Sequence, residues 1–520
     1  MTAAGVATAL TLPSGITIDT TRRPRLAVLG RDIILTNATT RSLLIDPDFN
    51  VYPLQLQAPA SAPVLSSSAS GGLTGTFRVK YTYIIKDPLS GRLIAESDFS
   101  PVSASSGAIT SKLLKATFAP SPDAAVTHTR FYRTLTGPGT VYFPWIDSDG
   151  RTSLTSISDD LSDASLQLVA APTTLGGAPG LATGSFMTLL VEWKDRLWGV
   201  GDKDVDVLRY TDIEKPYAWK TSQEFNVPPV GFDQFGITGL APRRDELGVL
   251  KRQFMSKITG DTGHFERQKV HQGKGCIAPE SVVVIDDVAY WLGEDGVYAW
   301  DSNGIRNISD GRVRKWFTTT TYFNRARFQN AFAKYNQKYH GYELHLAATG
   351  ASTENRWVVY DIERGKWWGP HLTATFTPTC AQGFFIDSDN LIVPAVGGSD
   401  GIIYVGNQSA LTDNTSAISV SATTAFHSME TPNITKLFGH TAILFAEQAA
   451  AGNLEVAAKI GALDASTVVT LAIDQTKGNR QEFPPLGEGE FCQLVFTEST
   501  NSAACQLFGY EIDTFELGRR

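Results

Sequence analysis

The chain has 520 residues, 42% of them hydrophobic, and a net charge of −8, so it can bury several cores and is mildly acidic. No stretch approaches the roughly 18 apolar residues of a membrane-spanning helix, and the N-terminal region carries Pro13 and Gly15 where a signal sequence needs a continuous apolar run. These features predict a soluble, non-secreted protein of three modules, with no membrane-spanning segment.

The first β pattern is Leu26–Leu35, in which two apolar runs flank a polar turn that we place at Asp32. The clearest copy of the pattern is Ser281–Gly304, which has three apolar runs separated by polar turns and so predicts an antiparallel meander. Similar turns occur at Lys194-Asp195, Arg244-Asp245, Asp286-Asp287, Asn336-Gln337 and Asp387–Asn390. Positions 195, 245, 287, 337 and 389 are separated by 50, 42, 50 and 52 residues, close to the roughly 40–50-residue repeat of propellers. The sequence therefore predicts an all-β fold with a β-propeller of about six blades.

An inserted domain is predicted between the first two blades. Asp32 and Asp195 are 163 residues apart, and removing the 110 residues of segment 66–175 leaves 53, one blade length. Within that segment Ser66–Gly72 looks like a linker, and Gly75–Lys86 alternates apolar and charged residues. Further strands are expected at Lys112–Phe118, His128–Thr134 and Thr140–Ile146, with a hairpin loop at Gly137–Gly139 and a closing linker at Ala171–Gly180. This pattern predicts a fibronectin-like β-sandwich of about 100 residues.

A separate C-terminal β domain is expected from position 411, with strands at Ala442–Ala446, Leu454–Ile460 and Thr467–Ile473. Residues 411–520 contain 13 Asp and Glu against 6 Lys and Arg, a balance of −7. The predicted organisation is a first blade with the N-terminal segment in 1–65, the sandwich in 66–175, the remaining blades in 176–410 and an acidic β domain in 411–520.

No zinc-protease motif and no phosphate-binding loop is found in the chain. The closest histidine pairs, His264/His271 and His340/His345, have no acidic third ligand at metal-site spacing. Turn carboxylates such as Asp286 and Glu294 allow calcium or acid chemistry, but Asp also favours turns by bonding the backbone. We therefore expect no enzyme activity, no catalytic residues, no metal and no cofactor.

The four cysteines, Cys276, Cys380, Cys492 and Cys505, have no C-x-x-C spacing. They are too few for a disulfide scaffold in a chain of this length, so buried free thiols are expected. A pairing of Cys492 with Cys505 across neighbouring strands is the alternative.

One basic and aromatic cluster stands out. Residues 311–340 contain seven basic side chains and no acidic one, interleaved with aromatic residues. The candidate assembly or DNA-proximal residues are Arg312, Arg314, Lys315, Trp316, Arg325, Arg327, Lys334 and Lys338. Such side chains bind a nucleic-acid backbone and stack on bases, and they also build intersubunit surfaces. An acidic chain attracts DNA poorly, which favours assembly over direct DNA contact.

Several segments resemble the tail nozzle or tail hub (tail tube) proteins of short-tailed double-stranded DNA bacteriophages. The segments are Leu247–Gly260, Lys274–Val284, Tyr290–Tyr298 and Ile308–Asp310. Glu96–Pro101 and His128–Thr134 look like the fibronectin-type pieces common in phage structural proteins. The resemblance covers most of residues 20–410.

This resemblance implies a structural virion protein. It implies a ring, typically a homohexamer, that extends the tail below the portal and adaptor and forms the channel for DNA ejection. Its partners would be further copies of itself, the tail adaptor protein above, and tail fibre, spike or needle proteins, with double-stranded DNA passing transiently through the lumen. Its location would be the tail of the virion, after synthesis and assembly in the host cytoplasm. The acidic module 411–520 is the expected lumen-facing or gate-proximal part.

Two alternatives remain from the sequence. A propeller can bind or cleave a glycan or bind a receptor, with Trp193, Trp198, Trp219, Trp367 and Trp368 as sugar platforms, although such aromatics also pack between blades. A non-viral cytoplasmic scaffold is the other.

Overall fold

The structure is a computed structural model. It describes residues 9–19, 24–36, 41–148, 155–169, 171, 187–228, 235–261, 264–311, 313–337, 340–372, 376–386, 392–405, 412–413, 416–417, 420–424, 426–429, 434–445, 455–462, 465–472, 480–498 and 507–518. The chain forms two compact units, the first made of residues 1–335, 340–352 and 359–368 and the second of the remainder, and each is described by itself.

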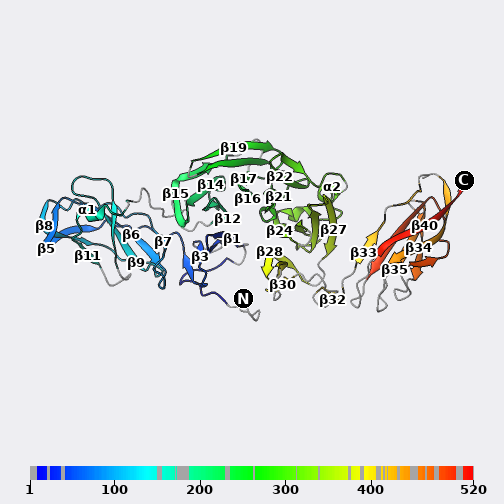
Figure 1. Cartoon of the computed structure of the whole chain (residues 1–520), viewed down its shortest axis with the longest axis horizontal. Coiled ribbons are helices and arrows are strands. Elements are labelled where there is room, and N and C mark those ends of the chain that lie inside the picture. The colour runs from blue at the N-terminus through cyan, green and yellow to red at the C-terminus, as the bar shows by residue number, and fades with distance from the viewer. Residues whose placement is uncertain are drawn as a thin grey trace. The chain divides into compact units, whose positions relative to one another are not determined.

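The fold is all-β, and its central feature is a succession of antiparallel sheets whose strand order follows the chain, as in propeller blades (Figure 1). The first blade contains β1 (Arg25–Leu29), β2 (Asp32–Thr36), β3 (Leu43–Ile45) and β4 (Val51–Pro53). The second contains β12 (Met187–Trp193), β13 (Arg196–Gly201), β14 (Val207–Asp212) and β15 (Lys215–Asn226). The third contains β16 (Gly239–Pro242), β17 (Leu247–Leu250), β18 (Phe254–Asp261) and β19 (His264–Gln272).

The later blades follow the same order. The fourth contains β20 (Val283–Ile285), β21 (Val288–Leu292), β22 (Val297–Asp301) and β23 (Gly304–Asn307), preceded by the short 3-10 helix η1 (Pro279–Ser281). The fifth contains β24 (Phe332–Asn336), β25 (Gly341–Leu346), β26 (Arg356–Asp361) and β27 (Lys366–Leu372). A sixth, three-stranded sheet contains β28 (Pro378–Ile386), β29 (Ile392–Gly398) and β30 (Ile403–Val405). The described residues thus contain five four-stranded sheets and one three-stranded sheet of this kind, which confirms the predicted propeller.

Neighbouring blades of the first unit pack through their first strands, because β1 contacts β12, β12 contacts β16, and β16 contacts β20. Trp193 and Trp198 of the second blade share a buried cluster with Leu247 of the third. Met255 of the third shares another with Trp291 of the fourth. The apolar runs in the repeat are therefore the interblade cores.

The predicted turns lie between the first and second strands of their blades. Lys194 and Asp195 have φ of 53° and 55°, and Asp286 and Asp287 have φ of 48° and 63°, the left-handed conformation of tight hairpins in which Asp is tolerated. The first blade differs from the prediction, because Asp32 is the first residue of β2 and the turn is Gly30-Arg31. Asn336 ends β24, and Asp387–Asn390 lies outside the described residues.

The segment between the first two blades forms two sheets around a shared core. One is β10-β9-β6-β7 and the other β11-β8-β5, and Tyr81 of the first sheet packs in one cluster with Leu114 of the second. The bounds are β5 (Val64–Gly75), β6 (Val79–Lys86), β7 (Leu93–Glu96), β8 (Ile109–Thr117), β9 (His128–Arg133), β10 (Phe143–Ser148) and β11 (Ser156–Asp159), with helix α1 (Asp163–Leu166).

The first predicted linker, Ser66–Gly72, is wrong. These residues belong to β5 and pair with β8, for example Ser67 with Leu114. Small polar residues suit an extended edge strand as well as a linker, so composition alone misplaced them. The hairpin at Gly137–Gly139 is confirmed, because it joins β9 to its antiparallel partner β10. Most of the second linker lies outside the described residues.

Ion pairs attach this sandwich to the first blade. Asp32 on β2 accepts two hydrogen bonds from the Arg92 guanidinium, at 2.7 and 2.9 Å. The Arg41 guanidinium lies 2.5 Å from the Asp123 carboxylate. Leu54 and Trp219, from the first and second blades, also share the hydrophobic cluster of the sandwich.

The C-terminal strands of the second unit form another sandwich. One sheet has the order β33-β39-β35-β36, and in the other β34 pairs with β37, β38 and β40. The bounds are β33 (Val420–Thr423), β34 (Thr435–Phe445), β35 (Glu455–Ala462), β36 (Ala465–Ala472), β37 (Arg480–Phe483), β38 (Gly487–Gly489), β39 (Phe491–Glu498) and β40 (Leu507–Gly518), after a small hairpin of β31 (Thr412–Asp413) and β32 (Ser416–Ala417). Ile443, Val456 and Leu494 form its core. Among the described residues no helix is long and apolar enough to cross a membrane.

Candidate functional site

The first hairpin turns of successive blades are joined to one another. The indole Nε1 of Trp193 donates to the carbonyl of Arg243 at 2.6 Å. Arg243 in turn donates from Nε to the carbonyl of Asp287 at 2.7 Å and from Nη2 to its carboxylate at 3.2 Å. His340 Nε2 lies 3.3 Å from the Asp286 carboxylate. The first turns are therefore linked from the second to the fifth blade, and the carboxylates of Asp287 and Asp286 make the links from the third to the fifth.

The loops between the second and third strands make a second series of contacts. The ammonium of Lys251, which is fully buried, lies 2.6 Å from Asp206 of the preceding blade. Arg252 Nε lies 2.5 Å from Glu294 of the following blade. Arg325 donates from Nη2 to the carbonyl of Glu294 at 3.0 Å. Glu294 is thus held by structural partners on both sides.

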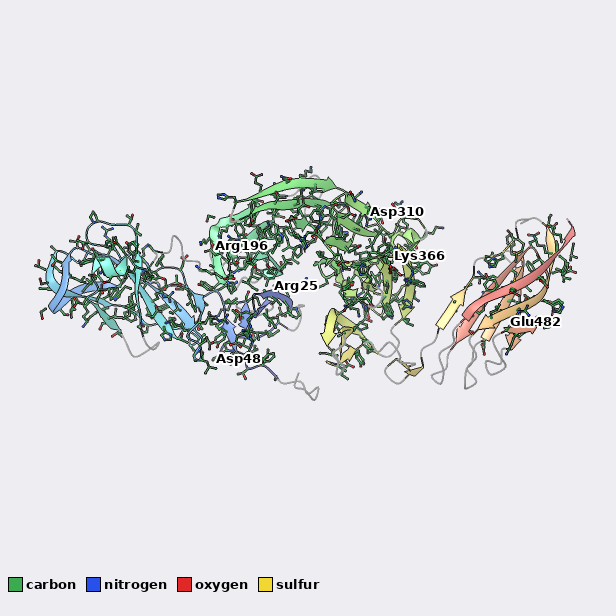
Figure 2. The ribbon with its side chains drawn as sticks, in the orientation of Figure 1. Arg25, Asp48, Arg196, Asp310, Lys366 and Glu482 are labelled. Atoms are coloured by element: carbon green, nitrogen blue, oxygen red, sulfur yellow. The ribbon has the colours of Figure 1, made fainter. Side chains whose placement is uncertain are left out.

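The predicted basic and aromatic cluster lies on a segment that connects the fourth and fifth blades. It consists of helix α2 (Arg314–Thr318) and the 3-10 helix η2 (Arg325–Asn330). Buried Phe317 anchors it, with its ring 6.0 Å from Phe323 and 5.9 Å from Trp367. Figure 2 labels Asp310, just before α2, and Lys366, on β27. A short, rigidly packed segment therefore presents the exposed side chains.

We name as the α2–η2 surface the residues Arg314, Lys315, Trp316, Tyr322 and Arg325. Arg314, Lys315, Tyr322 and Arg325 are exposed, and Trp316 is half-buried. The rings of Trp316 and Tyr322 are 6.2 Å apart. The Arg314 guanidinium lies 3.9 Å from Asp295 and 3.7 Å from Asp310, beyond hydrogen-bond distance. The surface thus offers cations beside aromatic faces.

The structure does not bring the whole predicted cluster together. Arg327 on η2 is half-buried, and Arg312 and Lys338 lie outside the described residues. The prediction that Lys334 is an assembly or DNA-proximal residue is wrong, because its side chain is only 4% exposed and its ammonium lies 2.9 Å from Glu343. It lies on β24 with alternate residues inward, a periodicity that counting charges alone does not detect.

Lys334 belongs to a buried polar group in the fifth blade. Glu343 Oε1 also lies 2.8 Å from His345 Nε2, and the His345 ring stacks on Phe332 with centroids 4.7 Å apart. Burial lowers the pKa of His345, although the bond to Glu343 acts in the opposite direction. His345, the second member of the predicted pair His340/His345, therefore has a structural role.

The tryptophans proposed as sugar platforms differ in exposure. Trp193, Trp198 and Trp219 are only 4%, 0% and 2% exposed, so they belong to the interblade core. Trp367 packs on Phe317 and donates to the carbonyl of Ile308 at 2.9 Å. Trp368 is 51% exposed.

Among the described residues, no set of three or more His, Cys, Asp or Glu side chains is arranged to hold a metal ion. Cys276, Cys380 and Cys492 are free thiols, and Cys276 and Cys492 are buried, as predicted. Cys380 is exposed instead. Cys505 lies outside the described residues, but the alternative pairing of Cys492 with Cys505 is wrong, because Cys492 is a free thiol.

A further surface was missed by the sequence analysis. Glu511, Asp513, Phe515 and Leu517 alternate with inward-facing Tyr510 and Ile512 along β40, and they are exposed. We name these four residues the β40 face. The signal was the alternation of apolar Tyr510 and Ile512 with acidic Glu511 and Asp513, which marks a strand with one solvated side.

No family model matches the chain, and no curated protein matches it. Among solved structures, the chain is similar to YCF48 bound to D1 peptide, with 11% identity and a TM-score of 0.28 over 60% of this chain and 90% of the other. It is also similar to an exo-β-1,3-galactanase of Phanerochaete chrysosporium with galactose, with 10% identity and a TM-score of 0.19 over 97% of this chain and 100% of the other. Both TM-scores are too low to support a fold assignment, so the propeller assignment is based on the order of the sheets in this chain.

Proposed function

We propose that this chain is a structural, non-enzymatic subunit of a ring, the tail nozzle or hub of a short-tailed double-stranded DNA phage. The observation that carries the proposal is the α2–η2 surface, in which exposed cations and aromatic rings are fixed on a rigid propeller edge. Arg and aromatic residues are enriched in protein interfaces. A rigid wall element with such a surface suits subunit assembly.

The use of the carboxylates supports a structural role. Asp286, Asp287 and Glu294 are bonded to side chains or backbone of neighbouring elements. Residues used in this way resist sliding of one blade on the next. That property suits a wall that must keep its shape while DNA passes.

The remaining features of the proposal come from the resemblance. The ring would be a homohexamer below the adaptor, in contact with fibre, spike or needle proteins, in the tail of the virion. The acidic C-terminal module is the candidate for a lumen-facing part, because a weakly repulsive surface lets a polyanion slide, whereas many Lys and Arg contacts would retain it.

The test is the solution mass of the purified chain by light scattering, followed by negative-stain images of the largest species. We expect rings or short tubes with a central channel. A chain that stays monomeric and binds sugars on a glycan array would contradict the proposal.

The second candidate is glycan binding, and the exposed Trp368 on β27 is the observation that favours it. An aromatic ring on the surface can stack on a sugar face. Loss of array binding in a Trp368→Ala variant, with Trp316→Ala as the comparison, would support this candidate over the ring.

A further inference from the structure

Two exposed surfaces of the chain are complementary in charge and in apolar character. The α2–η2 surface carries Arg314 and Lys315 beside the rings of Trp316 and Tyr322. Tyr322 is 38% exposed, and no ion pair joins the Lys315 ammonium to any described residue. Cations on this surface are thus available beside an apolar patch.

The β40 face carries the opposite charge. Phe515 and Leu517 are 59% and 50% exposed and lie two positions apart on one strand, so they form a small exposed apolar pair. Glu511 lies 3.0 Å from Arg480, which also pairs with Glu482, whereas Asp513 has no cationic partner among the described residues. Glu482, on β37, which pairs with β34 as β40 does, is labelled in Figure 2. The face is therefore apolar with an excess of carboxylates.

We propose that the α2–η2 surface of one copy binds the β40 face of a second copy. Trp316 and Tyr322 would cover Phe515 and Leu517, while Arg314 and Lys315 would meet Glu511 and Asp513. The occupant is a second copy because the same chain supplies both members of a charge-complementary pair, and each leaves large aromatic or aliphatic side chains in water. The inference rests on the proposed ring and names the contact that closes it.

The two surfaces are different, so the contact is heterologous. Each copy uses its α2–η2 surface on one neighbour and its β40 face on the other, and such contacts close into a ring when the rotation permits. A stable interface buries about 800 Å² per partner, which is more than these side chains supply, so they form the centre of the contact. Closure then strengthens each contact, because every copy is held at two points.

The test uses charge reversal in the full-length chain. One variant carries Arg314→Glu and Lys315→Glu, and the other carries Glu511→Lys and Asp513→Lys. Arg325 is left unchanged because it donates to the carbonyls of Thr318 and Glu294 and so holds η2 in place. Lys366→Glu on β27 and Glu455→Lys on β35 are matched controls, since both residues are exposed and lie on neither surface.

Association is measured by sedimentation velocity over a range of concentrations, with thermal unfolding to verify that each variant is folded. We expect each variant alone to bind itself about tenfold more weakly or worse than the original chain, and the controls to behave like the original. An equimolar mixture of the two variants should associate again, because each reversed surface then meets its match on the other variant. Association of the original chain should weaken with added salt.

Three results would overturn the contact. If both variants associate like the original chain, the ring stands but another surface closes it. If the mixture fails to recover although each variant is folded, the two surfaces do not meet. If the original chain shows no association at any concentration, both the contact and self-assembly of the ring fail. Of the three results, only this last one counts against the proposed function.

Discussion

The guanidinium of Arg243 in the third blade reaches Asp287 in the fourth, donating to its backbone carbonyl at 2.7 Å and to its carboxylate at 3.2 Å. The same guanidinium lies 4.5 Å from the centre of the Trp300 ring and 3.1 Å from Glu246. Arg243 is only 7% exposed. One side chain thus joins two blades through charge, hydrogen bonds and a ring.

Replacing Arg243 with alanine should destabilise the propeller. The change removes the guanidinium from Asp287 and uncovers Trp300, whereas Glu246 keeps Lys257 as a partner. Because the Asp287 carboxylate is 44% exposed, we expect a loss of about 1–3 kcal/mol. We expect a fall in the melting temperature measured by calorimetry. Arg244→Ala is the matched control, since Arg244 is exposed, and it should change stability by less than about 0.5 kcal/mol. Equal shifts for the two variants would refute the role of Arg243.

Gly275→Ala should be strongly destabilising. A Cβ atom at position 275 would lie against the carbonyl of Lys251 and the backbone of Arg252. The carbonyl of Gly275 also accepts the hydrogen bond of the Trp291 indole at 3.0 Å, so the backbone has no freedom to move away. We expect a loss of about 3 kcal/mol in denaturant unfolding. Gly509→Ala, where nothing lies within 4 Å of the added atom, should be neutral.

His345 should make the stability of the fifth blade depend on pH. Burial lowers its pKa from the ordinary 6.5, so below that pH the unfolded chain takes up a proton that the folded chain does not. The free energy of unfolding should therefore fall as the pH drops below 6.5, by at most about 1.4 kcal/mol per pH unit, until the folded pKa is reached.

This pH dependence can be measured from the melting temperatures of the original chain and of His345→Gln between pH 5 and pH 8, in steps of about one pH unit. Glutamine retains a donor for Glu343 and does not titrate, so its curve should be flatter. His264→Gln, at an exposed position, should leave the slope unchanged.

The cysteines should differ in reactivity. Burial raises the pKa of the Cys276 thiol to about 12, and its sulfur donates to the carbonyl of Ala278 at 3.1 Å. Cys380 is exposed. Iodoacetamide at mildly alkaline pH should label the Cys380 peptide about a hundredfold faster than the Cys276 peptide, as followed by mass spectrometry. Comparable rates would mean that the third and fourth blades open readily.

Much of the fold was predictable because its local signals agree. The apolar runs on either side of Lys194-Asp195 and Asp286-Asp287 required hairpins, and their spacing required repeats. Ser66–Gly72 was misplaced because its strand is defined by pairing with β8, a partner some 45 residues away that composition does not reveal.

The surface was harder to predict than the core. Lys334 and Arg314 look alike as charges in the sequence, yet one is buried against Glu343 and the other is exposed on α2. Only the alternation along β24 distinguishes them. The β40 face was overlooked because its carboxylates entered the sequence analysis only as part of the net charge of residues 411–520. Nothing in that sum placed Phe515 on the same side of the strand as Glu511 and Asp513.

The attachment of the sandwich to the first blade has a consequence during synthesis. Arg25 on β1 donates to the carbonyl of Thr188, 163 positions later in the chain. The first blade therefore cannot pack on the second until the residues up to Thr188 have left the ribosome. The sandwich emerges in between, and in the folded chain its Arg92 donates a hydrogen bond to Asp32 of the first blade. We expect the sandwich to fold first and to act as an intramolecular chaperone that covers the apolar side of the first blade. Its folding would also shorten the loop that must close before the second blade can pack on the first.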